Sequence, residues 1–153
     1  FPLAVAKGSE MGDGRVSLMV KPVAGSIDQA GGLAFAVRTA GTYLVLRINA
    51  LEDNLILFAF KDGRRSELAS AHVSVETGEW RELAVEVRGN TVTGFVDGTP
   101  CIVHDFDCAP KGLVGVWSKA DSVVEFSELC RSDGQSELVF LSRPAREIEM
   151  AGA

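Results

Sequence analysis

The sequence of 153 residues lacks the features that mark several large classes of protein. It contains no apolar run close to the roughly 20 residues that a membrane-spanning helix needs. It also contains no cluster of Lys and Arg that could neutralise a nucleic-acid backbone, and its formal net charge is −6. The most basic stretch, residues 61–65, is typical of a charged hairpin turn. We therefore expect neither membrane insertion nor nucleic-acid binding.

Cysteine and histidine are scarce as well. The three cysteines, Cys101, Cys108 and Cys130, have no C-x-x-C spacing, and only His72 and His104 could join them as zinc ligands. Cys101 and Cys108 lie on one extended segment, which separates their Cα atoms by far more than the roughly 4.4–6.8 Å that a disulfide allows. We therefore expect three structural free thiols and no disulfide within the chain.

No stretch shows a long helical periodicity, whereas apolar and polar residues alternate along much of the chain. Short alternating segments at intervals of roughly eight to twelve residues, with Gly, Asn and Asp turns between them, are typical of a β-sandwich or barrel. The Asp62-Gly63 pair between two such segments predicts a tight hairpin. We expect strands over residues 16–21, 33–38, 43–49, 55–60, 67–75, 80–88, 91–96, 101–106, 113–118 and 123–129, with one more over 137–141.

The pattern predicts an all-β fold in which two antiparallel sheets pack as a sandwich. Residues 1–130 would form the sandwich, and residues 131–153 would form a C-terminal extension with one added strand and a polar end. Ten residues on single faces of the strands should be buried between the sheets: Leu18, Val20, Leu33, Phe35, Leu44, Leu46, Ile48, Leu83, Val85 and Phe126.

Several motifs together carry a resemblance to a known family. They are residues 25–33 (GSIDQAGGL), residues 49–54 (NALEDN), a strand from Trp80 that leads to the Val96-Asp97-Gly98 turn, and residues 115–123 (GVWSKADSV). Over residues 1–129 the chain resembles the 3-keto-disaccharide hydrolase-like domains, formerly domains of unknown function, of the concanavalin A-like lectin/glucanase and laminin-G-like superfamily. The resemblance implies a jelly roll and a periplasmic or secreted location. It carries over no catalytic residue.

A catalytic pair of carboxylates is not evident from the residues themselves. Glycoside hydrolysis generally needs two carboxyl groups beside the scissile bond. Glu82 and Glu86 share a strand face, but Ala84 stands where the glucanase E-x-D-x-E signature has its middle acid, so we expect solvated surface charges. Glu52 and Asp53 fall in an expected turn, where such side chains usually bond the local backbone. We therefore assign no catalytic residue.

One strand face has a composition that suits a saccharide. An aromatic ring, a guanidinium and an amide project together, and sugars bind by stacking on rings and by hydrogen bonds from such groups. The stretch that best matches the family adds a second aromatic and two charges. We predict that six residues line the concave sheet and contact a saccharide: Tyr43, Arg47, Asn49, Trp117, Lys119 and Asp121.

The same residues also have a structural interpretation, in which Trp117 belongs to the core and Arg47 pairs with Asp121 or Glu52. Three functions stay open: a non-catalytic carbohydrate-associated module, which we favour, a hydrolase acting on keto-glycosides, and an interaction domain without a small ligand. No cofactor is expected, although the loop aspartates are compatible with calcium, with no basis for choosing ligands among Asp28, Asp53, Asp97 and Asp121.

Overall fold

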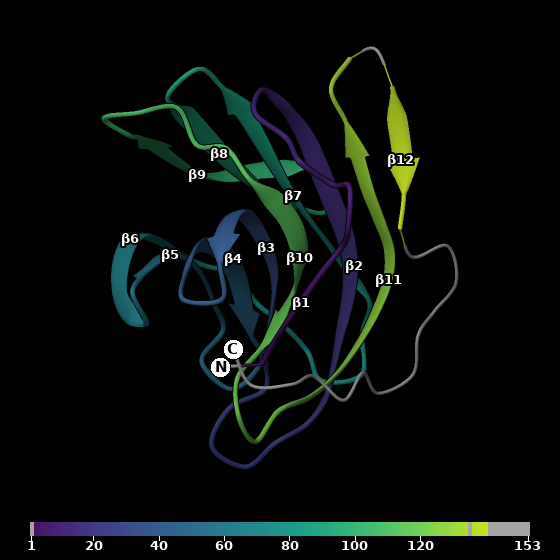
Figure 1. The fold of residues 1–153 in the computed structure, drawn as a ribbon. Coiled ribbons are helices and arrows are strands. Elements are labelled where there is room, and N and C mark those ends of the chain that lie inside the picture. The colour runs from purple at the N-terminus through teal and green to yellow at the C-terminus, as the bar shows by residue number, and fades with distance from the viewer. Residues whose placement is uncertain (1, 135, 141–153) are drawn as a thin grey trace.

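The computed structural model describes residues 2–134 and 136–140, and within them the chain is entirely β (Figure 1). The strands are β1 (Leu3–Val5), β2 (Gly14–Ala24), β3 (Ala30–Thr39), β4 (Thr42–Asn49), β5 (Asn54–Lys61), β6 (Arg64–His72), β7 (Arg81–Arg88), β8 (Thr91–Val96), β9 (Thr99–Asp105), β10 (Leu113–Ser118), β11 (Val123–Ser132) and β12 (Glu137–Val139).

The strands form two antiparallel sheets that pack face to face. In the described residues the first sheet has the order β1-β10-β3-β4-β5-β6, and the second has the order β12-β11-β2-β7-β8-β9. Both sheets therefore combine strands from the two ends of the chain, since β10 pairs with β3 and β11 pairs with β2. This arrangement confirms the predicted all-β jelly-roll sandwich.

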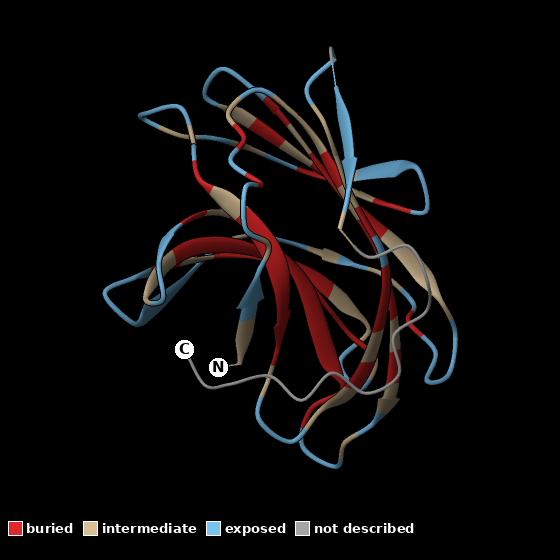
Figure 2. Cartoon of the chain, turned by 45° about the vertical axis from the view of Figure 1, so that its right-hand side comes forward, coloured by how far each residue is buried: buried red, intermediate tan, exposed pale blue. Residues whose placement is uncertain are grey.

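The main core lies between the two sheets. All ten residues predicted to be buried belong to it, and buried residues follow the middle strands of each sheet while turns are exposed (Figure 2). Alternation accounts for this arrangement, because every second residue of a strand points to the same face. Phe35 opposite Leu44, and Leu33 opposite Leu46, are cross-strand pairs of this core on β3 and β4.

The turns follow the predicted chemistry. Asp62 and Gly63 have φ values of 50° and 79°, and Asp97 and Gly98 have values of 50° and 82°. Two successive positive φ angles are the mark of the type I′ hairpin, whose twist matches that of the flanking strands. Each Asp-Gly pair therefore fixes the register of its hairpin.

The structure differs from the prediction mainly at the edges of the sheets. The strand expected over residues 67–75 is β6, which begins at Arg64 and ends at His72, and β1 was not expected. The strand expected over residues 137–141 is β12, which pairs with β11 and ends at Val139; residue 141 lies outside the described residues. Cys101, Cys108 and Cys130 are all free thiols, as expected.

Candidate functional site

The first sheet carries a second buried cluster on its outer face, the face turned away from the second sheet. This outer-face cluster consists of Ala30, Ala34, Val37, Tyr43, Val45, Ile56, Phe58, Phe60 and Trp117. On β4 the residues Leu44, Leu46 and Ile48 point into the main core, so Tyr43 and Val45 between them point outward. The predicted division of this strand into two faces is therefore confirmed.

Two of the six predicted residues form an aromatic pair within this cluster. The indole Nε1 of Trp117 donates a hydrogen bond of 3.1 Å to the hydroxyl oxygen of Tyr43. The Tyr43 ring stacks on Phe60 with 4.6 Å between the ring centroids. Burial raises the pKa of Tyr43 above its ordinary value, and the bond from Trp117 offsets part of that rise. Trp117 is fully buried, so the pair supports the face from within rather than forming an exposed platform.

Arg47 lies further along the same face of β4 and is only 2% exposed. Its Nη2 donates to Oδ1 of Asn54, its Nη1 lies 3.7 Å from Oε2 of Glu52, and its guanidinium lies 5.3 Å from the centre of the Phe58 ring. The Nε atom is buried without a hydrogen-bond partner. Burial lowers the pKa of Arg47, and the carboxylates of Glu52 and Asp28 act in the opposite direction.

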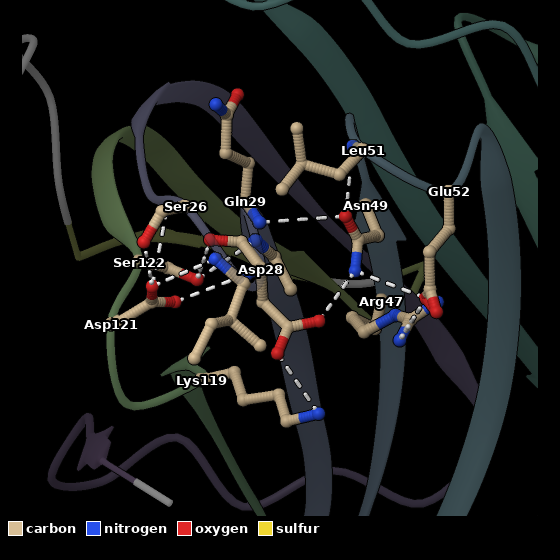
Figure 3. Close-up of polar contacts among 12 residues, drawn as sticks. Ser26, Asp28, Gln29, Arg47, Asn49, Leu51, Glu52, Lys119, Asp121 and Ser122 are labelled. Carbon is tan, nitrogen blue, oxygen red and sulfur yellow. Dashed lines mark hydrogen bonds and ion pairs between the residues drawn. The ribbon is translucent and has the colours of Figure 1, made fainter.

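Asn49 connects the neighbouring loops. Its Nδ2 donates to Oδ1 of Asp28 at 3.0 Å and to Oε2 of Glu52 at 3.2 Å (Figure 3). Its Oδ1 accepts from the backbone N–H groups of Leu51 at 3.0 Å and Gln29 at 3.4 Å. A fully buried amide that uses both ends in this way holds the loop before β3 against the loop after β4.

Lys119 completes a continuous chain of contacts, which we call the polar network. Its Nζ lies 3.1 Å from Oδ2 of Asp28, so the network runs Lys119–Asp28–Asn49–Glu52–Arg47 (Figure 3). Asp28, Asn49 and Arg47 are buried. Two other members of the network reach solvent, with 29% of the Lys119 side chain and 48% of the Glu52 side chain exposed. Saccharide hydroxyls both donate and accept hydrogen bonds, and these two exposed side chains offer a donor and an acceptor.

Asp121 serves a different purpose. Its carboxylate accepts hydrogen bonds from the backbone N–H groups of Ser26 at 3.1 Å, Ile27 at 2.9 Å and Asp28 at 3.0 Å (Figure 3). These bonds, that from Ile27 first, lower the pKa of Asp121 although burial opposes them. Of the two partners considered for Arg47, the structure thus selects Glu52, because Asp121 is turned toward the loop before β3.

Sequence reasoning did not include three members of this region in the predicted site. From the sequence, Asp28 was considered only as one of the loop aspartates compatible with calcium. Glu52 was considered only as a turn residue or as a partner for Arg47. Ser122 was not considered; its Oγ accepts from the N–H of Ala30 at 3.0 Å and donates to the carbonyl of Asp28 at 3.1 Å. All three residues lie in the motifs that carry the family resemblance, at residues 25–33, 49–54 and 115–123. Their presence in these motifs was the sequence signal that could have placed them in the site.

Three of the four acids in the two candidate catalytic pairs make structural contacts outside the polar network. Glu82 and Glu86 lie on β7, where Arg15 bridges them, its nitrogens 4.0 and 3.8 Å from the two carboxylates. Asp53 has a φ of 50° and its Oδ1 accepts from the backbone N–H of Val75 at 2.9 Å, which is a turn-forming role. The contacts of Glu82, Glu86 and Asp53 match their structural interpretation, whereas Glu52 belongs to the polar network.

The described residues contain neither a metal-binding cluster nor a membrane-spanning helix. Over residues 2–134 and 136–140 no three His, Cys, Asp or Glu side chains gather closely enough to hold a metal ion. Of the loop aspartates, Asp97 contacts Arg81 with 2.6 Å between Oδ2 and Nε. No helix within the described part of the chain is long and apolar enough to cross a membrane.

Comparison with known proteins identifies the fold. No family model and no curated protein sequence matches the chain. Its structure is similar to that of the carbohydrate binding module CBM66 from Bacillus subtilis, with a TM-score of 0.74 and 18% identity over 81% of this chain and 77% of that one. It is also similar to the galectin LEC-6 from Caenorhabditis elegans, with a TM-score of 0.58 and 15% identity over 86% and 94% of the two chains.

A third similar structure is an enzyme, the Bacillus licheniformis β-glucanase, with a TM-score of 0.52 and 14% identity. The match covers 74% of this chain but only 56% of the glucanase. At these levels of identity the similarity concerns the fold and not the activity. The chain therefore has the jelly-roll fold that is found in lectins, carbohydrate-binding modules and glucanases.

Proposed function

We propose that this chain is a non-catalytic module that binds carbohydrate through the end of the first sheet where the polar network lies. The observation that carries the proposal is the network itself, a series of buried charged and amide groups that holds two side chains, Lys119 and Glu52, in solvent. Holding Arg47 and Asn49 in a buried position costs rotamer entropy and desolvation. A module that only needed to fold would obtain more stability there from apolar side chains.

The six predicted residues have different roles in this proposal. Lys119 and the added residue Glu52 contact sugar hydroxyls, while Arg47 and Asn49 fix the position of Glu52 and Asp28 from beneath. Asp121 shapes the adjoining loop, and Tyr43 and Trp117 stiffen the sheet that carries them. Exposed apolar side chains at this end, Ile27 and Leu51, offer contacts for the C–H faces of a sugar ring.

The similar structures support a carbohydrate ligand, because a carbohydrate binding module and galectins are among them. They also include a β-glucanase, which keeps a hydrolase of the keto-glycoside type as the alternative. Against catalysis stands the geometry of Glu82 and Glu86, which Arg15 bridges and between which Ala84 stands in place of an acid. We further propose the extracytoplasmic location that the family resemblance implies, since most polysaccharides lie outside the cytoplasm.

A glycan array followed by titration calorimetry tests the proposal. The wild-type chain should retain at least one neutral glycan, and Lys119→Ala should weaken that binding by roughly tenfold, as expected for one charge-assisted hydrogen bond. Lys61→Ala removes an equally charged, exposed side chain from a distant hairpin and should leave the affinity unchanged.

Two results would contradict the proposal. Release of reducing sugar from the bound glycan would identify a hydrolase instead. Failure of the folded wild-type chain to bind any glycan would leave the third function, an interaction domain without a small ligand.

A further inference from the structure

The sandwich has another end, opposite the polar network, where the β3–β4 hairpin lies. Two adjacent hollows occur there, with volumes of about 200 and 370 Å³. They share two residues, Arg38 at the end of β3 and Lys111 just before β10. Together the hollows form a groove that passes between these two cationic side chains.

The backbone around this groove departs from regular sheet geometry. Ala36 has a φ of 49°, and the pairing of β3 with β4 shifts between Phe35 and Thr39. Such a bulge bends a strand and re-aims the side chains that follow it. Gly112 brings the crossing segment between β9 and β10 close to this bulge, since a Cβ there would lie 2.6 Å from the backbone of Val37. Arg38 and Lys111 are thus placed by tightly packed backbone.

The walls of the smaller hollow are apolar and include no carboxylate. Tyr43, Phe60, Phe106 and Pro110 line it, and of these Phe106 and Pro110 are half-buried and therefore reachable from solvent. The larger hollow adds one acid, Glu10. Neither Arg38 nor Lys111 forms an ion pair with any residue of 2–134 or 136–140.

We infer that this groove binds an acidic sugar unit, with its carboxylate between Arg38 and Lys111 and its apolar face against Phe106 and Pro110. The inference builds on the proposed carbohydrate function but names a separate site and a charged substrate class. Two unpaired cations beside an apolar wall complement a sugar that carries a carboxylate on a ring with a C–H face. In a chain of net charge −6, a local cationic pair is also a place that an acidic polymer could approach.

Calorimetry with two trisaccharides tests this inference on the whole chain. An oligogalacturonate trimer should bind the wild type at least about tenfold more tightly than the uncharged galactose trimer of the same linkage. Raising the salt concentration should reduce that preference, because exposed ion pairs are screened. The double variant Arg38→Ala/Lys111→Ala should abolish the preference.

A matched control removes the same charge elsewhere. Lys21→Ala/Arg88→Ala deletes two cations from β2 and β7 of the second sheet and should keep the preference for the acidic trimer. If both double variants lower it equally, net charge alone is responsible and the inference is wrong.

The test also separates this site from the polar network. If Lys119→Ala abolishes binding of the acidic trimer while Arg38→Ala/Lys111→Ala does not, the carbohydrate function stands and the second site is refuted. If no neutral glycan binds but the acidic trimer does so through Arg38 and Lys111, the groove is confirmed and the network proposal fails.

Discussion

At the scale of single residues, the polar network has consequences for stability that can be measured. Replacing Arg47 by alanine leaves the charge of Glu52 without its partner and opens space beside Phe58. We expect Arg47→Ala to lower the free energy of unfolding by about 1–3 kcal/mol, because packing on Phe58 and the bond to Asn54 are lost while Glu52 stays half-exposed. Urea denaturation monitored by circular dichroism provides the measurement.

Arg64→Ala is the control for this measurement, because Arg64 is exposed on the edge strand β6. Its effect should stay within about 0.5 kcal/mol. A similarly small effect for Arg47→Ala, together with loss of glycan binding, would mean that Arg47 contacts the ligand directly.

The carboxylate of Asp121 makes the loop before β3 sensitive to acid. Its pKa is lowered in the folded chain by the bonds from Ile27, Asp28 and Ser26. The stabilising contribution of such a group is therefore fully present above the unfolded pKa of about 3.9, and it is lost as the pH falls through the lower folded value. NMR should show the amide signals of Ile27 and Asp28 shifting together with the titration of Asp121 below pH 3.9.

Asp121→Asn supplies the control, because an amide oxygen still accepts hydrogen bonds but does not titrate in this range. In this variant the acid transition of the two amides should disappear. A titration of Asp121 at or above the value in unfolded peptides would show that the three backbone bonds do not form in solution.

The face of β4 on which each side chain lies could be predicted from the sequence, but the residue that pairs with Arg47 could not. Alternation along β4 placed Tyr43, Arg47 and Asn49 on one face, because that depends only on the period of a strand. The choice of Glu52 over Asp121 as the partner of Arg47 depends on the paths of two loops. Those paths are fixed by turn geometry and long-range packing, which a single sequence does not display.

At the scale of elements, the central strands were easier to predict than those at the edges. A strand packed on the core shows clear alternation, as β2 does over its eleven residues. The edge strand β6 is mostly exposed. Because its first residues, from Arg64, are polar, no alternation marks the position where the strand begins. The edge strand β1 has only three residues, too few for a period to appear.

The short strand β1 stays in place through one close contact. A Cβ at Gly115 of β10 would lie 2.1 Å from the carbonyl oxygen of Ala4, so only glycine permits this pairing. We expect Gly115→Ala to displace β1 and to lower the free energy of unfolding by about 1–3 kcal/mol. Hydrogen exchange at the amide of Ala6, which bonds the carbonyl of Val114 at 2.9 Å, should become faster.

The comparison for this variant is Gly12→Ala. The atoms nearest to a Cβ there belong to the flexible side chain of Lys111, the closest at 3.2 Å, and this side chain can move aside. Exchange at Ala6 should be unchanged in that variant. Unaltered exchange in Gly115→Ala would show that β1 is not held by this contact.

At the scale of the whole molecule, the two sheets should unfold as one unit, because a single core cluster spans both of them. The chain has a tryptophan beside each sheet, Trp80 just before β7 and Trp117 on β10. In the variant Trp80→Phe, the fluorescence of Trp117 reports on the first sheet alone. We expect its urea transition to coincide with that of far-ultraviolet circular dichroism, and separate midpoints would reveal independent sheets.

The fold of the molecule followed from the sequence more readily than its ligand. Two-faced strands joined by Asp-Gly hairpins permit few arrangements other than a sandwich. The same fold supports binding modules and hydrolases, so the ligand depends on a few side chains at its ends. The polar network and the groove at Arg38 and Lys111 each became visible only when distant loops were brought together.

The pairing of β2 with β11 also has a consequence during synthesis. Residue 24 ends β2 and residue 132 ends β11, so at ordinary elongation rates the ribosome needs roughly 5 to 20 seconds to supply the second partner. Throughout that interval one edge of β2 has no strand beside it. Lys21 and Pro22 lie on that edge, opposite Glu125 and Val124 in the finished sheet. A charged residue and a proline both discourage pairing with a foreign strand, and here they would protect the nascent chain until β11 has been synthesised.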